Sequence, residues 1–108
     1  RVIGEINEKK LNFLIDTGAT NIILSPQHAK MIGINLNNIN YDLIIQTANG
    51  IGKASSHKVK YIKIGNINFK NMNVKINKRE MPFSLLGMDF LNKLDSFKVE
   101  GNTMILVK

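Results

Sequence analysis

Three neighbouring residues near the beginning of the chain, Asp16, Thr17 and Gly18, are the ones best suited to chemistry. They follow Leu14 and Ile15, which are typical of a buried strand. Gly18 can adopt backbone angles that other residues avoid, and the Thr17 hydroxyl can hydrogen-bond close to a charge. The pattern presents the Asp16 carboxylate at the end of a strand, where a carboxylate can serve as a general acid or base.

An Asp followed by Thr and Gly also fits an ordinary Asx turn that ends a strand. With average residue usage this tripeptide arises by chance in roughly two per hundred chains of such length. Two further features favour a functional site. The apolar-apolar-glycine element at residues 85–87 leads into a helical pattern, and a glycine-bearing hairpin lies between it and Asp16.

Together these features resemble the signature of the retropepsin-like aspartic proteases of the pepsin clan. The pattern apolar-apolar-Asp-Thr/Ser-Gly-Ala/Ser is matched by residues 14–19, and the later apolar-apolar-Gly element by residues 85–87. Residues 47–52 and 85–91 look most like the bacterial single-lobe members, including the rickettsial one. The resemblance covers nearly the whole chain. It implies one all-β catalytic domain over residues 1–108, a closed single-lobe acid-protease barrel with a flap hairpin and one or two short helices.

The resemblance also implies an activity and a set of site residues. The chain would be an aspartic endopeptidase in which Asp16 from each of two protomers activates a water molecule, with no metal or cofactor. Thr17 and Gly18 would support the catalytic loop. Peptide or protein substrates would contact residues of that loop, of the flap and of the second apolar element, namely Gly18, Ala19, Ala48, Asn49, Gly50, Ile51, Gly52, Leu85 and Leu86.

A homodimer is part of this expectation, because the chain holds a single Asp-Thr-Gly within 108 residues, enough for one domain. Two-lobed relatives carry two such motifs. Retroviral relatives have a strand before their first hairpin that interleaves with the partner's last strand, whereas only Arg1 precedes Val2 here. We therefore expect this fragment to dimerise weakly.

Localisation is inferred from the resemblance, since bacterial relatives commonly have a hydrophobic segment upstream that anchors the precursor in the cell envelope. No apolar run in these residues approaches the roughly 20 needed to span a bilayer, so we expect this fragment to be soluble. Cysteine is absent, which excludes disulfides and thiolate metal sites. His28 and His57 are too few and too far apart in sequence to suggest a metal site, and His28, within a predicted short helix, is assigned a surface or packing role.

The formal net charge of +7, from 15 basic and 8 acidic residues, raises the alternative of a basic module that binds nucleic acid. The lysines are scattered, aromatic residues are 6%, and no nucleic-acid-binding motif accompanies them, so we favour a solvated basic surface and no nucleic-acid partner. A second alternative is a non-catalytic interaction domain that kept the lobe and lost activity. The intact Asp-Thr-Gly argues against it.

The remaining pattern predicts the elements that position the site. Strands are expected at residues 2–6, 11–15 and 21–24, followed by a short helix that begins at Ser25-Pro26 and ends at Gly33. Residues 36–40 are expected to form a loop. Residues 41–47 and 53–64 form the candidate flap around a turn at 48–50, with a bulge or bend near 61–62. Residues 78–82 are expected to be a connection, and Gly101-Asn102 the turn of a closing hairpin. A strand at 84–87 would lie beside the Asp16 loop, before a helix at 88–94 and a closing hairpin at 97–107. Asp89, in the first turn of that helix, is assigned to the helix dipole instead of a second catalytic carboxylate.

Overall fold

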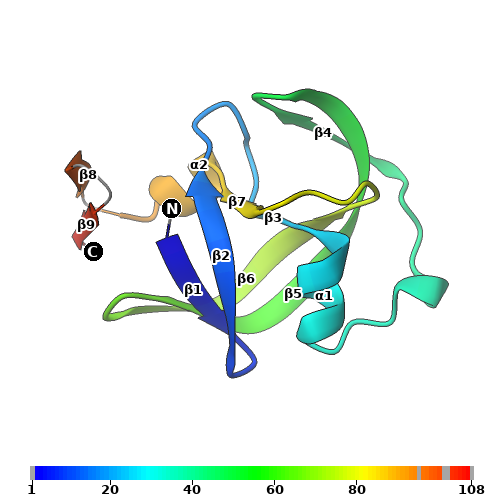
Figure 1. Cartoon of the computed structure of the whole chain (residues 1–108), viewed down its shortest axis with the longest axis horizontal. Coiled ribbons are helices and arrows are strands. Elements are labelled where there is room, and N and C mark those ends of the chain that lie inside the picture. Colours follow the sequence, from blue (N-terminus) through cyan, green and yellow to red (C-terminus); the bar gives the residue numbers. More distant parts are fainter. Residues whose placement is uncertain (1, 95, 101–102, 108) are drawn as a thin grey trace.

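Six strands close a barrel, because the first strand pairs with both the second and the fifth. The structure is a computed structural model that describes the backbone of residues 2–94, 96–100 and 103–107 and the side chains of residues 2–94. Around the barrel the strands run β1, β2, β7, β3, β6, β5 and back to β1. Their bounds are β1 Val2–Ile6, β2 Lys9–Ile15, β3 Ile23–Leu24, β5 Gly50–Ile64, β6 Ile67–Asn77 and β7 Ser84–Leu86. The expected all-β closed barrel is confirmed (Figure 1).

A hairpin extends beyond the barrel where β4, Leu43–Thr47, pairs with the first part of β5. The turn at its tip is Ala48-Asn49, and β5 begins at Gly50, three residues before the predicted position. In Figure 1 this tip lies beside the loop that follows β2, at the top of the barrel. We call β4, the turn and residues 50–54 of β5 the flap.

Within the described residues, two short helices and one 3-10 turn join the strands: α1 Pro26–Met31, η1 Leu36–Asn38 and α2 Met88–Leu91. The Ser25 side chain caps α1 as predicted, by accepting the His28 backbone N–H. Gly33 follows the helix with a φ of 96°, in the left-handed region that suits glycine. The helix α2 is shorter than the predicted 88–94, and η1 lies in the segment predicted as a loop.

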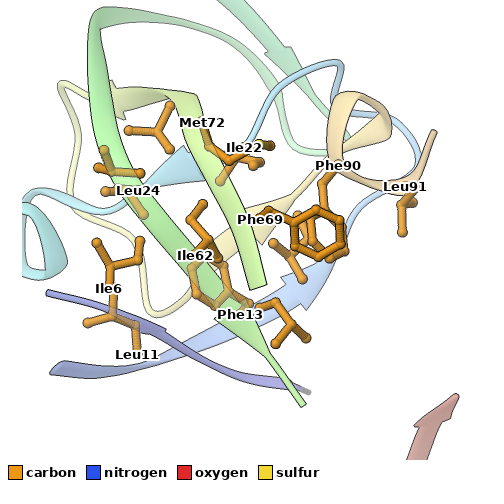
Figure 2. Close-up of a cluster of buried hydrophobic side chains, with 14 of the residues drawn as sticks. Ile6, Leu11, Phe13, Ile22, Leu24, Ile62, Phe69, Met72, Phe90 and Leu91 are labelled. Carbon is orange, nitrogen blue, oxygen red and sulfur yellow. The ribbon is translucent and has the colours of Figure 1, made fainter. Parts of the chain in front are cut away.

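The core fills the barrel with buried side chains from all six of its strands and from α2 (Figure 2). Alternation along β2 turns Leu11 and Phe13 inward and leaves Asn12 exposed. The rings of Phe69 and Phe90 meet edge to face with centroids 4.9 Å apart. Burial of each such side chain contributes about 1.5–3 kcal/mol. This core fixes β2 and α2 on either side of the Asp16 loop.

The two long strands change their inward face at the same point. Val59 and Ile62 are both buried on β5, as are Phe69 and Met72 on β6, so each strand skips one position. Val59 pairs with Met72 and Ile62 with Phe69, which means that neither strand has an extra residue. Asn71, with a φ of 55°, lies between these pairs. The predicted irregularity is therefore a bend shared by both strands, and not a bulge in one.

The closing hairpin is formed by β8, Ser96–Glu100, and β9, Thr103–Val107, which pair with each other in a separate two-stranded sheet. This matches the hairpin predicted at 97–107. Its predicted turn, Gly101-Asn102, lies outside the described residues.

Candidate active site

Asp16 is held by the strand that runs beside its own. β2 and β7 are parallel, with Ile15 opposite Leu86, and the backbone N–H of Asp16 donates to the Leu86 carbonyl oxygen at 3.0 Å. The Asp16 carbonyl oxygen accepts the Ala19 N–H at 3.1 Å, which closes the turn. The carboxylate therefore leaves the barrel from a backbone that is hydrogen-bonded on both sides.

Both carboxylate oxygens of Asp16 accept backbone N–H groups. Oδ1 accepts from Gly18 at 2.9 Å, and Oδ2 accepts from Ala48 at the flap tip at 3.1 Å. A Cβ on Gly18 would lie 3.1 Å from Asp16 Oδ1, closer than ordinary van der Waals contact, and 3.4 Å from the Ala48 nitrogen. Glycine at position 18 thus lets the loop and the flap meet at the carboxylate.

The chain at Gly87 supports the same loop from the other side. A Cβ there would collide with the Asn21 carbonyl oxygen and lie 2.7 Å from that of Ala19. The first residues of α2 then donate to the loop, from Met88 N–H to the Ala19 carbonyl and from Asp89 N–H to that of Thr20, both at 2.8 Å. The two motifs found in the sequence, far apart along the chain, are therefore one structural unit.

The predicted loop residues differ in exposure. Thr17 and Gly18 are exposed on the surface of the loop, whereas Ala19 is buried against Ile23 and Ile45. Leu86 is also buried, inside the barrel. Ala19 and Leu86, both predicted to contact substrate, thus lie beneath the surface and support the loop.

A hollow of about 280 Å³ lies beside the flap. Five of the predicted substrate-binding residues line it: Asn49, Gly50, Ile51, Gly52 and Leu85. Its floor includes Leu14, which is 37% exposed, and Ile51 on the flap is 75% exposed. Apolar side chains open to solvent beside a carboxylate are suited to bind the side chains of an extended peptide.

The opposite wall of the hollow is formed by Asn77 and residues 79–83, and of these residues 79–82 were predicted only as part of a connection. Asn77, at the end of β6, accepts the Arg79 N–H at 3.1 Å through Oδ1 and places Nδ2 3.0 Å from the Met81 sulfur. The wall then continues through residues 79–83. An Asn at the end of a strand is a known turn signal, which could have marked this bend but not its position opposite the flap.

Asp89 is a second acidic group next to the loop, half-buried at the start of α2. Burial raises the pKa of its carboxyl above the ordinary value of 3.8, while hydrogen bonds from the Asn21 side chain and from the backbone of Phe90 and Ile22 act in the opposite direction. Its Oδ1 is buried and has no hydrogen-bond partner among the described residues. The backbone N–H of Asp89, which donates to the Thr20 carbonyl oxygen at 2.8 Å, ties the start of α2 to the loop.

Over residues 2–94, whose side chains are described, no three His, Cys, Asp or Glu residues are grouped as a metal site would require. The helices within the described ranges are also too short, or too polar, to cross a membrane.

Comparisons with known proteins agree on one family. The family model for the gag-polyprotein putative aspartyl protease matches residues 2–93. An uncharacterized protein of Rickettsia prowazekii is 34% identical over 101 residues, and one from Sinorhizobium sp. is 33% identical over 102 residues. Each alignment covers 94% of this chain but only 43% and 44% of those proteins, so the chain spans less than half the length of these curated relatives.

Among solved structures, a retropepsin-like aspartic protease from Rickettsia conorii is similar with a TM-score of 0.79 and 28% identity, over 97% of this chain and 77% of that one. The EIAV protease in complex with an inhibitor gives a TM-score of 0.69 and 26% identity, over 91% of this chain and 89% of the viral one. With its closed barrel, its Asp16 loop under a flap and a family match over residues 2–93, the chain belongs to the retropepsin-like aspartic protease family.

Proposed function

We propose that the chain is an aspartic endopeptidase whose active site forms when two copies bring their Asp16 carboxylates together. The observation that carries the proposal is the placement of Asp16, which directly follows β2 and accepts the backbone N–H of Ala48 at the flap tip, while Leu14 of the same strand lines the hollow beside the flap. Each chain holds a single Asp-Thr-Gly loop, so the second carboxylate has to come from another copy. The exposed Thr17 and Gly18 leave this face of the loop open to that copy.

The chemistry follows from two carboxylates held close together. Like charges at short range cannot both ionise readily, so the pair shares one proton. The ionised member takes a proton from a bound water, which attacks the peptide carbonyl carbon. The protonated member stabilises the developing oxyanion by a hydrogen bond, and the member that took the proton from water passes it to the leaving amine, so that the pair again shares one proton. The scissile C–N bond breaks without a covalent link to the enzyme.

The flap and the hollow supply the binding part of the site. An extended peptide would lie between Asp16 and the flap, with backbone hydrogen bonds to Gly18 and to the flap strands. Apolar side chains would enter the hollow beside Leu14, Ile51 and Leu85. In this proposal Thr17 braces the two loops across the dimer axis, and the last strand, β9, contributes to the dimer contact. Full-length relatives would carry this domain on a membrane-anchored precursor.

The test is cleavage of a mixed peptide library near about pH 6, where a shared-proton pair keeps one acid and one base. The wild-type domain is compared with Asp16→Asn and with Asp42→Asn, the same exchange at an exposed acid that lies outside the catalytic loop, just before β4. We expect Asp16→Asn and a transition-state analogue to abolish cleavage and Asp42→Asn to retain it. Cleavage that survives Asp16→Asn would refute the assignment.

A mixing experiment tests the two-chain site. When dimers are saturated and subunits exchange, an equal amount of Asp16→Asn protein should lower wild-type activity to about one half, because mixed dimers lack one carboxylate. Addition of Asp42→Asn protein should cause no loss. The alternative of a non-catalytic interaction domain predicts dimers without cleavage under every condition, including with a longer natural segment restored.

A further inference from the structure

A buried serine next to the Asp16 loop has two polar partners from other elements. Ser84 is the first residue of β7 and is fully buried. Its Oγ accepts the backbone N–H of Ser25 at 3.0 Å and lies 2.6 Å from Nδ1 of His28 in α1. The sequence reading gave His28 a surface or packing role, and its contact with Ser84 is more specific than that.

The positions of the protons follow from the partners of Ser84. Its oxygen already accepts the Ser25 N–H, so its own hydroxyl proton needs an acceptor inside the protein. A neutral imidazole with an unprotonated Nδ1 is such an acceptor, and its remaining proton then lies on Nε2. Protonation of Nδ1 would turn it into a donor to Ser84 Oγ, and the buried Ser84 hydroxyl proton would then lose its acceptor.

The hydrogen bonds of Ser84 and Ser25 join α1 to β7, and β7 pairs with β2, the strand that leads to Asp16. The His28 backbone N–H donates to Ser25 Oγ at 3.1 Å, so the same serine caps α1 and contacts β7. Along β7, Ser84 pairs with Phe13 of β2, and the carbonyl of Leu86 accepts the N–H of Asp16 at 3.0 Å. The position of β7 thus sets the position of the Asp16 backbone.

Electrostatics favour the neutral form of His28. Burial lowers the pKa of its imidazole below the ordinary value of 6.5, and the nearby Glu80 carboxylate opposes this shift only in part. Glu80 Oε1 accepts the backbone N–H groups of Gln27 and Met81 at 3.4 and 3.3 Å, which places this acid between α1 and the wall of the hollow. Among the described groups, Glu80 is the titratable residue whose charge acts on His28.

We propose that His28 is a positioning residue, whose neutral imidazole holds β7 through Ser84 and so keeps Asp16 in place, and whose protonation sets an acid limit to activity. This inference rests on the proposed endopeptidase function. Its sign follows from the hydrogen bonds: when His28 is protonated at low pH, Nδ1 becomes a donor, the buried Ser84 hydroxyl proton loses its acceptor, and the support for the Asp16 loop weakens.

The experiment compares pH profiles of kcat/KM for the wild type and His28→Asn. Asparagine places a non-titrating acceptor where Nδ1 lies, whereas His28→Ala removes the acceptor and His57→Asn exchanges the other histidine, which is exposed. Between about pH 7 and about pH 4.5 we expect the wild type to lose severalfold in activity relative to His28→Asn. His28→Ala should be impaired across the range, and His57→Asn should follow the wild type.

A second readout does not depend on cleavage. Nitrogen-15 spectra of the two imidazoles, assigned with the His57→Asn variant, should show His28 as the Nε2–H tautomer at neutral pH. The Ser84 and Asp16 amide resonances should shift with the His28 midpoint. A protonated Nδ1 at neutral pH, or identical acid limbs for the wild type and His28→Asn, would overturn the proposal. If no variant cleaves peptide, the endopeptidase function fails, and the imidazole and amide titrations alone decide whether His28 positions Asp16.

Discussion

The backbone N–H of Ala48 lies 3.1 Å from Oδ2 of Asp16, so the flap tip rests directly on the carboxylate of its own chain. Neighbouring strands in a sheet are about 4.7–4.9 Å apart, and a peptide bound between flap and loop needs one such spacing on each side. The closed flap leaves no room for it. In this conformation the flap has to lift before an extended peptide can reach Asp16.

Hydrogen exchange at Ala48 measures this contact. We expect the Ala48 amide to exchange slowly in the wild type, although it lies at an exposed hairpin tip, and to exchange at least about tenfold faster in Asp16→Ala, since a hydrogen bond to a charged group contributes about 1.5–3 kcal/mol. Asp42→Ala is the matched control and should leave the rate unchanged. Equal Ala48 rates in the wild type and Asp16→Ala would show that the contact does not hold the flap.

Gly87→Ala should destabilise the fold strongly. The new methyl group would meet the carbonyl oxygens of Asn21 and Ala19, which are backbone atoms and cannot rotate away. Overpacking of this kind costs about 1–3 kcal/mol or more, measured as a shift in the urea midpoint. At Gly52 an added Cβ would have ordinary contacts of 3.7 and 3.8 Å, so Gly52→Ala should unfold close to the wild type. Equal midpoints for the two variants would contradict the tight contact at Gly87.

Asp89→Asn should stabilise the protein at neutral pH. The raised pKa means that the folded state binds a proton more readily than the unfolded state, so ionisation of Asp89 lowers stability as pH rises from 3.8 through the folded pKa. The variant removes that charge. The gain in the free energy of unfolding should be within about 1 kcal/mol, because the Asp89 carboxyl is half exposed and water screens its charge. The advantage should disappear below about pH 3.8, where both states of the wild type are protonated.

Urea unfolding at neutral pH and near about pH 3 provides the comparison, with Asp42→Asn as the control for exchange of a surface acid. A variant that is less stable than the wild type at neutral pH would instead mean that the hydrogen bonds of the Asp89 carboxylate outweigh its burial.

Asn77→Ala should change peptide binding more than the chemical step. Without the Asn77 amide, residues 79–81 lose the bonds that hold them opposite the flap, and the hollow loses a fixed wall. For a peptide with a bulky apolar side chain we expect KM to rise severalfold while kcat stays within about twofold. Asn73→Ala, at an exposed position of the same strand, is the control. A fall in kcat at unchanged KM would assign Asn77 to the chemistry instead.

The local sequence was sufficient to predict most strands and helices and to identify Asp16 as the central carboxylate. Apolar-rich stretches predicted β1 and β2, the Asn-Gly turn predicted most of the flap, and Ser25-Pro26 predicted the start of α1, because strand composition, turns and helix capping depend on neighbours in the chain. The Asp16 loop and the glycine element at 85–87 were recognised from their resemblance to a family, and the family match over residues 2–93 agrees with it.

Tertiary structure alone decided which groups meet. Three contacts at the site join residues that are far apart in the chain. Ala48 reaches Asp16 across 32 positions, Gly87 packs against the Asn21 carbonyl across 66, and Ser84 contacts His28 across 56. Sequence periodicity shows which face of a strand is inward, but not which partner lies across the barrel. The bend shared by β5 and β6 has the same origin, because closure of the barrel bends both strands together while their residue-by-residue pairing stays in register. The sequence therefore determined the local elements and the identity of the carboxylate, and closure of the barrel decided its partners.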